Sequence, residues 1–152
     1  ESCLDQEAIS ARVVQGRTYE VMAASDLILV ASGTATLEAA IIGTPMVIVY
    51  RLAFLSWLLG RVLIRVPYVG MVNLVAGRRV VPELIQFHAT PERIADEARR
   101  LLLSTEQRLR MRQELQQVRD RLGPPGAVGR TVDAILECLQ SGAVEGMAVQ
   151  RG

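Results

Sequence analysis

Two short apolar runs, separated by one helix-length segment, constrain the fold of this chain more than any other feature of its sequence. The runs are Leu27–Ala31 and Met46–Tyr50, and each is bounded by polar or turn-forming residues. Such runs are typical of strands that are buried on both faces of a parallel sheet. The segment Thr34–Ile42 between them favours a helix, which the following glycine and proline would end. The sequence therefore predicts a βαβ unit with a right-handed crossover.

Smaller elements are expected on both sides of this unit. We expect a short strand over Arg12–Val14 and a short helix over Thr18–Ala24. Residues 71–89 are less regular, and they predict a functional loop followed by a short helix near Pro82–Phe87.

The second half of the chain carries the signatures of covering helices. Thr90-Pro91-Glu92 combines an N-cap residue, a proline in the first turn and an acidic side chain at the positive end of the helix dipole. Ser104-Thr105-Glu106-Gln107 is a capping box. Apolar residues between Val132 and Leu139 mark a last helix, and residues 141–152 predict a flexible tail. The fold class is therefore α/β, with a partial Rossmann-like parallel sheet and several C-terminal covering helices.

The composition excludes several kinds of site. All 17 basic residues are arginine, which rules out a catalytic lysine and a Walker-type phosphate lysine. The net charge of +1 gives no strong field for nucleic acid. Two distant cysteines and one histidine form no metal motif, so we expect no metal. No uncharged apolar stretch is long enough for a membrane-spanning helix, so none is expected.

The best candidate for a binding site follows the first apolar run, because ligands of open parallel sheets bind beyond the carboxyl ends of the strands. Ser32 and Gly33 allow a tight turn into the helix, whose N-terminus offers free backbone N–H groups to a phosphate. Ser32, Thr34 and Thr36 add hydroxyl groups. Glu38 lies one turn past Thr34, about 6 Å along the helix axis, where a carboxylate can accept hydrogen bonds from a ribose. This spacing predicts a bound nucleoside diphosphate; an ordinary helix cap followed by a common glutamate remains the alternative.

Five blocks of the sequence form a recognisable set: Ser25–Ala40, Gly43–Arg51, Val66–Gly70, Asn73–Arg78 and Val81–Gln86. Taken together and in this order, these blocks closely resemble the lipid-A-disaccharide synthase family. The first block alone is shared by many B-type glycosyltransferases that bind UDP-sugars, whereas the full set is far more specific. The resemblance covers about residues 12–140.

The resemblance implies that residues 1–140 form the C-terminal, UDP-sugar-binding domain of a B-type glycosyltransferase, incomplete at its N-terminal side. In the family, the enzyme transfers 2,3-diacylglucosamine from UDP-2,3-diacylglucosamine to 2,3-diacylglucosamine 1-phosphate (lipid X) and releases UDP. Neither a metal nor another cofactor is implied. The acceptor-binding domain and its catalytic base lie outside this chain, so the isolated chain is expected to be inactive.

Carried over position by position, the family pattern assigns roles to several residues. Glu38 would hold the ribose, and Asn73 would approach the UDP-sugar from a loop. The family usually has Leu-Pro before this asparagine, and Met71-Val72 in its place would loosen that loop. The diphosphate would be contacted by Ser32, Gly33, Thr34 and Thr36. Further candidates at the same site are Arg51, Glu83 and Gln86.

The resemblance also implies a location and partners. The substrates are lipids, so we expect a cytoplasmic protein at the inner face of the inner membrane. The basic and aromatic segment Leu52–Ile64 has the character of an interfacial helix, but packing on the sheet or on a partner subunit is favoured, which leaves a homodimer open. Two other functions remain as alternatives. One is a non-catalytic α/β binding or oligomerisation module, and the other is a different enzyme that uses UDP-N-acetylglucosamine.

Overall fold

The computed structural model of the chain describes residues 10–53, 67–124 and 126–149. These fall into two compact units, Glu1–Arg121 and Leu122–Gly152, and each is described by itself.

The first unit is built on a parallel three-stranded sheet with the strand order β1-β2-β3. Strand β1 spans Ile28–Ala31, β2 spans Met46–Tyr50 and β3 spans Glu83–Ile85. Helix α3, Ala35–Ile42, connects β1 to β2, so the predicted βαβ unit is confirmed. The α/β fold class is confirmed with it.

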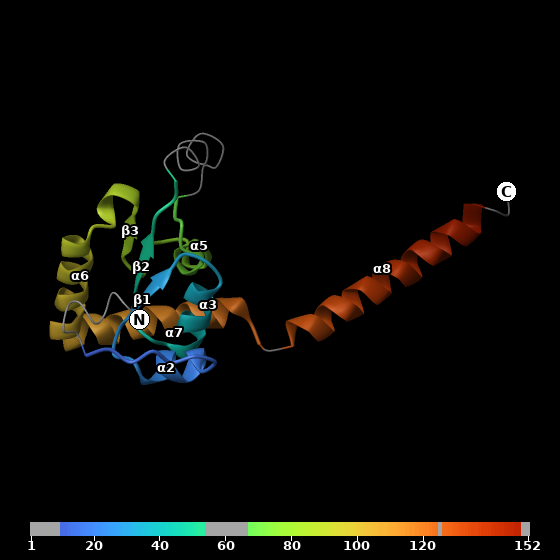
Figure 1. Ribbon diagram of the computed structural model, residues 1–152. Coiled ribbons are helices and arrows are strands. Elements are labelled where there is room, and N and C mark those ends of the chain that lie inside the picture. Colours follow the sequence, from blue (N-terminus) through green and yellow to red (C-terminus); the bar gives the residue numbers. More distant parts are fainter. Residues whose placement is uncertain (1–9, 54–66, 125, 150–152) are drawn as a thin grey trace. The chain divides into compact units, whose positions relative to one another are not determined.

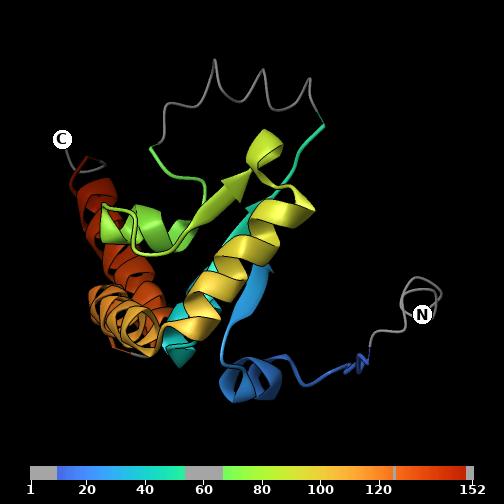
Figure 2. The same ribbon diagram turned by 90° about the vertical axis from the view of Figure 1, so that its left-hand side faces the viewer.

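Helices cover both faces of this sheet (Figure 1). Helix α3 and helix α5, Met71–Ala76, lie on one face, and helix α6, Pro91–Leu103, lies on the other. Figure 2 shows α6 in front of the strands. Helix α2, Thr18–Ala24, and helix α7, Thr105–Leu122, complete the unit.

The core of the first unit forms around the central strand, because β2 has neighbours on both sides and on both faces. Apolar side chains from β2, α5, α6 and α7 meet there and exclude water, which is the main favourable contribution to folding. Those with 1% exposure or less include Met46, Val47, Ile48, Val72, Leu101, Leu115 and Val118. Leu109 is 52% exposed, so it does not belong to the buried face of α7.

The second unit is the helix α8, Ala127–Val149. The last predicted helix is therefore present, but it continues to Val149, through most of the segment 141–152 that was expected to be a flexible tail. Its apolar side chains are exposed where the structure describes them, among them Val128, Val132, Ile135, Leu136 and Leu139.

Three predicted elements differ from the structure. Residues 12–14 form no strand. Most of the segment Leu52–Ile64 lies outside the described residues. The helix predicted near Pro82–Phe87 is instead strand β3 followed by the short 3-10 helix η1, Gln86–His88. Pro82-Glu83 has the sequence of a helix start, but the Ile48 N–H donates to the Pro82 carbonyl at 2.9 Å, and β2 then pairs with the residues that follow.

The start of α6 gives a test of a predicted cap. The Thr90 hydroxyl accepts a hydrogen bond from the Arg93 N–H. Hydrogen bonds from its own backbone and from the Thr90 side chain hold the pKa of Glu92 below its usual value. We expect Thr90→Ala to lower the free energy of unfolding by about 1 kcal/mol and to raise the pKa of Glu92.

Because this pKa is lowered in the folded protein, the stability that Glu92 contributes is present at neutral pH and is lost as the pH falls through the folded pKa. Urea unfolding and a carboxyl NMR titration measure the two effects. Thr131→Ala, which removes an exposed hydroxyl from inside α8, is the control and should change neither. An unchanged Glu92 titration in Thr90→Ala would contradict the assignment of the cap.

Candidate functional site

The segments that follow the three strands meet at one edge of the sheet. Parallel strands all end on the same side, and the register pairs Ala31 with Val49 and Tyr50 with Ile85. Ser32 follows β1, Arg51 follows β2 and Gln86 follows β3, so the structure brings these predicted site residues to the carboxyl edge. This edge is where ligands of open α/β sheets bind.

The turn between β1 and α3 presents backbone donors at this edge. Gly33 has φ 150°, a conformation that side chains disfavour, and Thr34 is the N-cap of α3 without a side-chain cap bond. In the part of the chain that the structure describes, the N–H groups of Gly33, Thr34 and Ala35 donate to no protein acceptor. Free N–H groups at the positive end of a helix dipole form a seat for an anion.

The three hydroxyl side chains of this turn have different surroundings. Ser32 Oγ donates to the Val69 carbonyl at 2.8 Å, and Thr36 Oγ1 donates to the Gly33 carbonyl at 2.8 Å. Thr36 is fully buried, whereas Thr34 is exposed. The hydroxyls of Ser32 and Thr36 thus hold the turn in shape, and Thr34 is the hydroxyl directed to solvent. A sequence pattern of three hydroxyl groups could not distinguish these roles.

Glu38 lies on α3, one turn beyond Thr34, and is half-buried. Among the residues described, none donates a hydrogen bond to its carboxylate and none forms an ion pair with it. Its two oxygens are therefore available as acceptors about 6 Å along the helix from the free N–H groups, as the sequence predicted.

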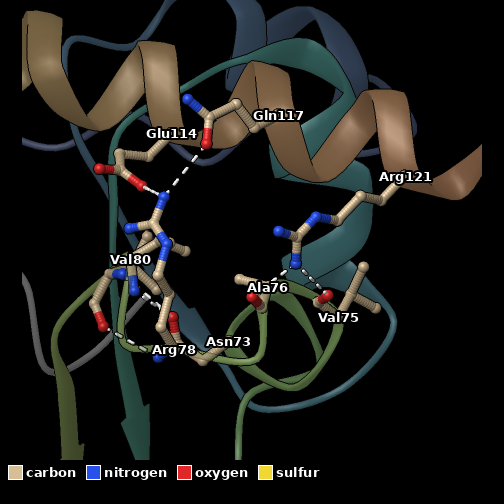
Figure 3. Close-up of polar contacts among 9 residues, drawn as sticks. Asn73, Val75, Ala76, Arg78, Val80, Glu114, Gln117 and Arg121 are labelled. Carbon is tan, nitrogen blue, oxygen red and sulfur yellow. Dashed lines mark hydrogen bonds and ion pairs between the residues drawn. The ribbon is translucent and has the colours of Figure 1, made fainter.

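Asn73 lies in helix α5, so the prediction of a loop position was wrong. Its side chain is fully buried and makes four hydrogen bonds within the protein. Oδ1 accepts from the N–H groups of Val80 and Val81 at 2.8 and 3.1 Å (Figure 3). Nδ2 donates to the Val81 carbonyl at 3.0 Å and to Glu83 Oε1 at 2.8 Å. These bonds use the full capacity of the amide, and they fix α5 against the start of β3.

The two residues before Asn73 form the first turn of α5 and not a loop. Val72 is fully buried in the core, and the Asn73 N–H donates to the Gly70 carbonyl in this turn.

Glu83 is the first residue of β3, and its carboxylate accepts hydrogen bonds from the backbone of the segment before α5. Oε2 accepts from the Val69 N–H at 3.1 Å, and Oε1 accepts from the Gly70 N–H at 2.9 Å as well as from Asn73. A glutamate can begin this strand because its charge meets three N–H donors in place of water.

Side chains of helix α7 also bond to the end of α5 and to Arg78, which follows it. The Arg121 guanidinium donates to the carbonyls of Val75 and Ala76, at the C-terminal end of α5, at 3.2 and 2.6 Å (Figure 3). Arg78 pairs with Glu114 and donates to Gln117 at 3.1 Å. The alternation of basic and acidic residues along α7 does not reveal in the sequence which arginine reaches backbone carbonyls.

The two remaining candidates lie after β2 and β3. Gln86 has φ 54°, and its amide pairs with the Leu52 backbone: Oε1 accepts from the N–H at 3.0 Å and Nε2 donates to the carbonyl at 2.8 Å. It therefore positions the chain that leaves β2. Arg51, the residue before this pair, is exposed and contacts no acceptor within the described ranges.

Two features are absent from the described residues. They contain no group of three or more His, Cys, Asp or Glu side chains that could hold a metal ion. None of the helices described is both long and apolar enough to cross a membrane.

The sheet and its carboxyl edge place this chain among the open parallel α/β domains whose ligands bind beyond the strand ends. The chain belongs to the lipid-A-disaccharide synthetase family, whose sequence profile matches residues 2–127.

Relatives in several bacteria agree with this assignment. A lipid-A-disaccharide synthase of Myxococcus xanthus is 45% identical over 150 aligned residues, which cover 93% of this chain and 39% of that protein. Those of Syntrophus aciditrophicus and Solibacter usitatus are each 50% identical, and the alignments cover 78% and 85% of this chain. The alignments span 31% and 34% of those two proteins. The alignments thus span between 31% and 39% of the length of these relatives.

The four bonds of Asn73 predict a large effect of a small change. Asn73→Asp replaces the Nδ2 donor by a carboxylate oxygen that faces the Glu83 carboxylate and the Val81 carbonyl. We expect the free energy of unfolding to fall by about 2 kcal/mol or more at pH 7, since buried acceptors are left without donors. Protonation of the new carboxyl group restores a donor, so the loss should shrink as the pH is lowered.

Urea unfolding at several pH values, followed by circular dichroism, measures this effect. The matched control is Gln113→Glu, which adds the same charge at an exposed position of α7 and should change stability little. A loss for Asn73→Asp no greater than that of the control would show that the amide does not secure this segment.

Proposed function

We propose that the protein containing this chain is a glycosyltransferase of lipid A biosynthesis and that the chain supplies its UDP-sugar-binding part. The proposal is supported by membership of the lipid-A-disaccharide synthetase family. The observation that carries it is the turn after β1, where backbone N–H groups lie one helical turn from the Glu38 carboxylate, and both are without a partner among the residues that the structure describes. Those are the two features that a nucleoside diphosphate requires, a seat for its phosphates and an acceptor for its ribose.

In the proposed reaction, a hydroxyl oxygen of the acceptor forms a bond with the anomeric carbon of the donor sugar. The bond between that carbon and the β-phosphate oxygen breaks, and its electron pair leaves with UDP. The acceptor hydroxyl loses its proton to a base outside this chain. The task of this chain is to stabilise the negative charge that develops on the departing diphosphate.

The residues of the turn divide this task. The N–H groups of Gly33, Thr34 and Ala35, together with the dipole of α3, face the diphosphate. The exposed hydroxyl of Thr34 adds one donor, whereas Ser32 and Thr36 keep the turn in its conformation. Asn73 acts from the core by holding α5. The exposed Arg51 is a cation at the same edge and can pair with an anionic group of the substrate.

The finer assignments are part of the same proposal. The donor is UDP-2,3-diacylglucosamine, the acceptor is 2,3-diacylglucosamine 1-phosphate, and the protein works at the cytoplasmic face of the inner membrane. Family membership favours this function over a non-catalytic module and over other enzymes that use UDP-N-acetylglucosamine.

The role of Glu38 can be tested with two ligands. We expect Glu38→Gln to weaken binding of UDP about 10- to 150-fold, because charge-assisted hydrogen bonds to the ribose contribute about 1.5–3 kcal/mol. Binding of inorganic pyrophosphate, which has no ribose, should change much less. Titration calorimetry measures both ligands. Glu106→Gln, on α7, is the control and should leave both unchanged. Equal losses for the two ligands would mean that Glu38 is structural.

A product assay tests the division of labour between this chain and the rest of the protein. The 152-residue chain should form no disaccharide from the two lipid substrates, whereas the full-length protein should form it. The reason is that holding both reactants in one cleft contributes about 7–11 kcal/mol to such a reaction, and this chain offers residues for the donor only. Disaccharide formed by the chain alone would place the catalytic base within it. No product from the full-length protein would count against the proposed function.

A further inference from the structure

We propose that Glu83 is a positioning residue for the nucleotide-binding turn, and that it acts through the backbone of Val69 and Gly70 and the hydroxyl of Ser32. The proposal rests on the proposed function, because it concerns the same turn at the end of β1. It assigns to Glu83 a role different from that of a substrate ligand or a base.

The first step is the occupation of the carboxylate. Both oxygens of Glu83 accept hydrogen bonds from within the protein, Oε2 from the Val69 N–H and Oε1 from the Gly70 N–H and Asn73 Nδ2. All three distances lie between 2.8 and 3.1 Å. The carboxylate thus accepts hydrogen bonds from two consecutive backbone N–H groups. It could bind a substrate only if these hydrogen bonds were broken.

The second step is the close approach of the gripped backbone. Gly70 is buried, and a Cβ atom there would lie 2.2 Å from Ile48 Cδ1 and 3.0 Å from Glu83 Oε1. A larger residue would force the ends of these two side chains to shift, whereas glycine lets the backbone lie against β2 and the carboxylate as they stand. The segment is therefore clamped between the central strand and Glu83.

The third step links this clamp to the site. The Val69 carbonyl accepts a hydrogen bond from Ser32 Oγ at 2.8 Å, across 37 residues of sequence. Ser32 immediately precedes Gly33 and Thr34, whose free N–H groups form the seat proposed for the diphosphate. The position of Val69 thus sets the position of the turn, and Glu83 sets the position of Val69.

A conservative variant separates positioning from other roles. Glu83→Gln keeps the shape and one oxygen of the side chain but brings an N–H donor against a backbone N–H. In the full-length protein we expect a rise of about 5- to 10-fold in the dissociation constant of UDP, as for the loss of one hydrogen bond. In kinetics the loss should fall mainly in KM, whereas a general base would lose 100-fold or more in kcat. Amide hydrogen exchange at Val69 and Gly70, and at Thr36, whose N–H donates to the Gly33 carbonyl, should become faster even without ligand.

A double-mutant cycle with Ser32→Ala tests the path. Ser32→Ala, in the surface turn, should weaken UDP binding to a similar extent. The double variant should have no lower affinity for UDP than the single variant with the lower affinity, because both substitutions break the same link. Additive losses would overturn the proposal. So would a large fall in kcat with unchanged amide exchange, which would make Glu83 a catalytic residue. Glu92→Gln, at the exposed start of α6, is the control.

The two proposals can fail separately. If UDP does not bind the unmodified protein, the proposed function fails, while faster exchange at Thr36 in Glu83→Gln still reports the link. If Glu83→Gln does not fold, Ser32→Ala should still alter the amide shifts of Val69 and Gly70. Unchanged exchange at Thr36 together with unchanged amide shifts at Gly33, in the variants that fold, would overturn the positioning role.

Discussion

The arrangement of residues 67–85 depends on the buried amide of Asn73, which joins helix α5 to the residues that begin β3. The connection from β2 to β3 returns to the sheet through a six-residue helix and a three-residue strand, and neither is long enough to be stable alone. Four hydrogen bonds from one side chain join the two elements, and the Glu83 carboxylate joins them to the segment before α5. Apolar contact would bring these segments together, but the hydrogen bonds set their relative positions.

The parts of the fold that could be predicted from the sequence are those with local causes. The apolar runs that became β1 and β2, the helix between them and the cap at Thr90 each carry their signal within a few residues. Strand β3 and helix α5 were missed because their causes lie elsewhere: β3 forms because β2 offers it a partner, and α5 is fixed by residues 80–83. A polar residue such as Glu83 contradicts a strand pattern unless its donors, Val69 and Gly70, are known.

The candidate site shows the same division. The position of the turn at the carboxyl edge, and of Glu38 one turn further along α3, could be anticipated from spacing. The internal use of the Ser32 and Thr36 hydroxyls could not, because each hydroxyl is bound to a carbonyl that the sequence pattern does not locate. The role of Arg121 could not be anticipated either, because its guanidinium donates to the last carbonyls of α5 from a position 45 residues further along the chain.

The clamp at Gly70 has a consequence for protein engineering. A designer who transplants the nucleotide-binding turn onto another parallel sheet would ordinarily copy the strand, the turn and the first helix. In this protein that fragment would lack the carbonyl that orients Ser32. The transferable unit is therefore discontinuous and consists of β1 through α3 together with residues 69–83. The recipient sheet must also supply a central strand with a side chain that leaves room for the backbone of a glycine, as Ile48 does for Gly70.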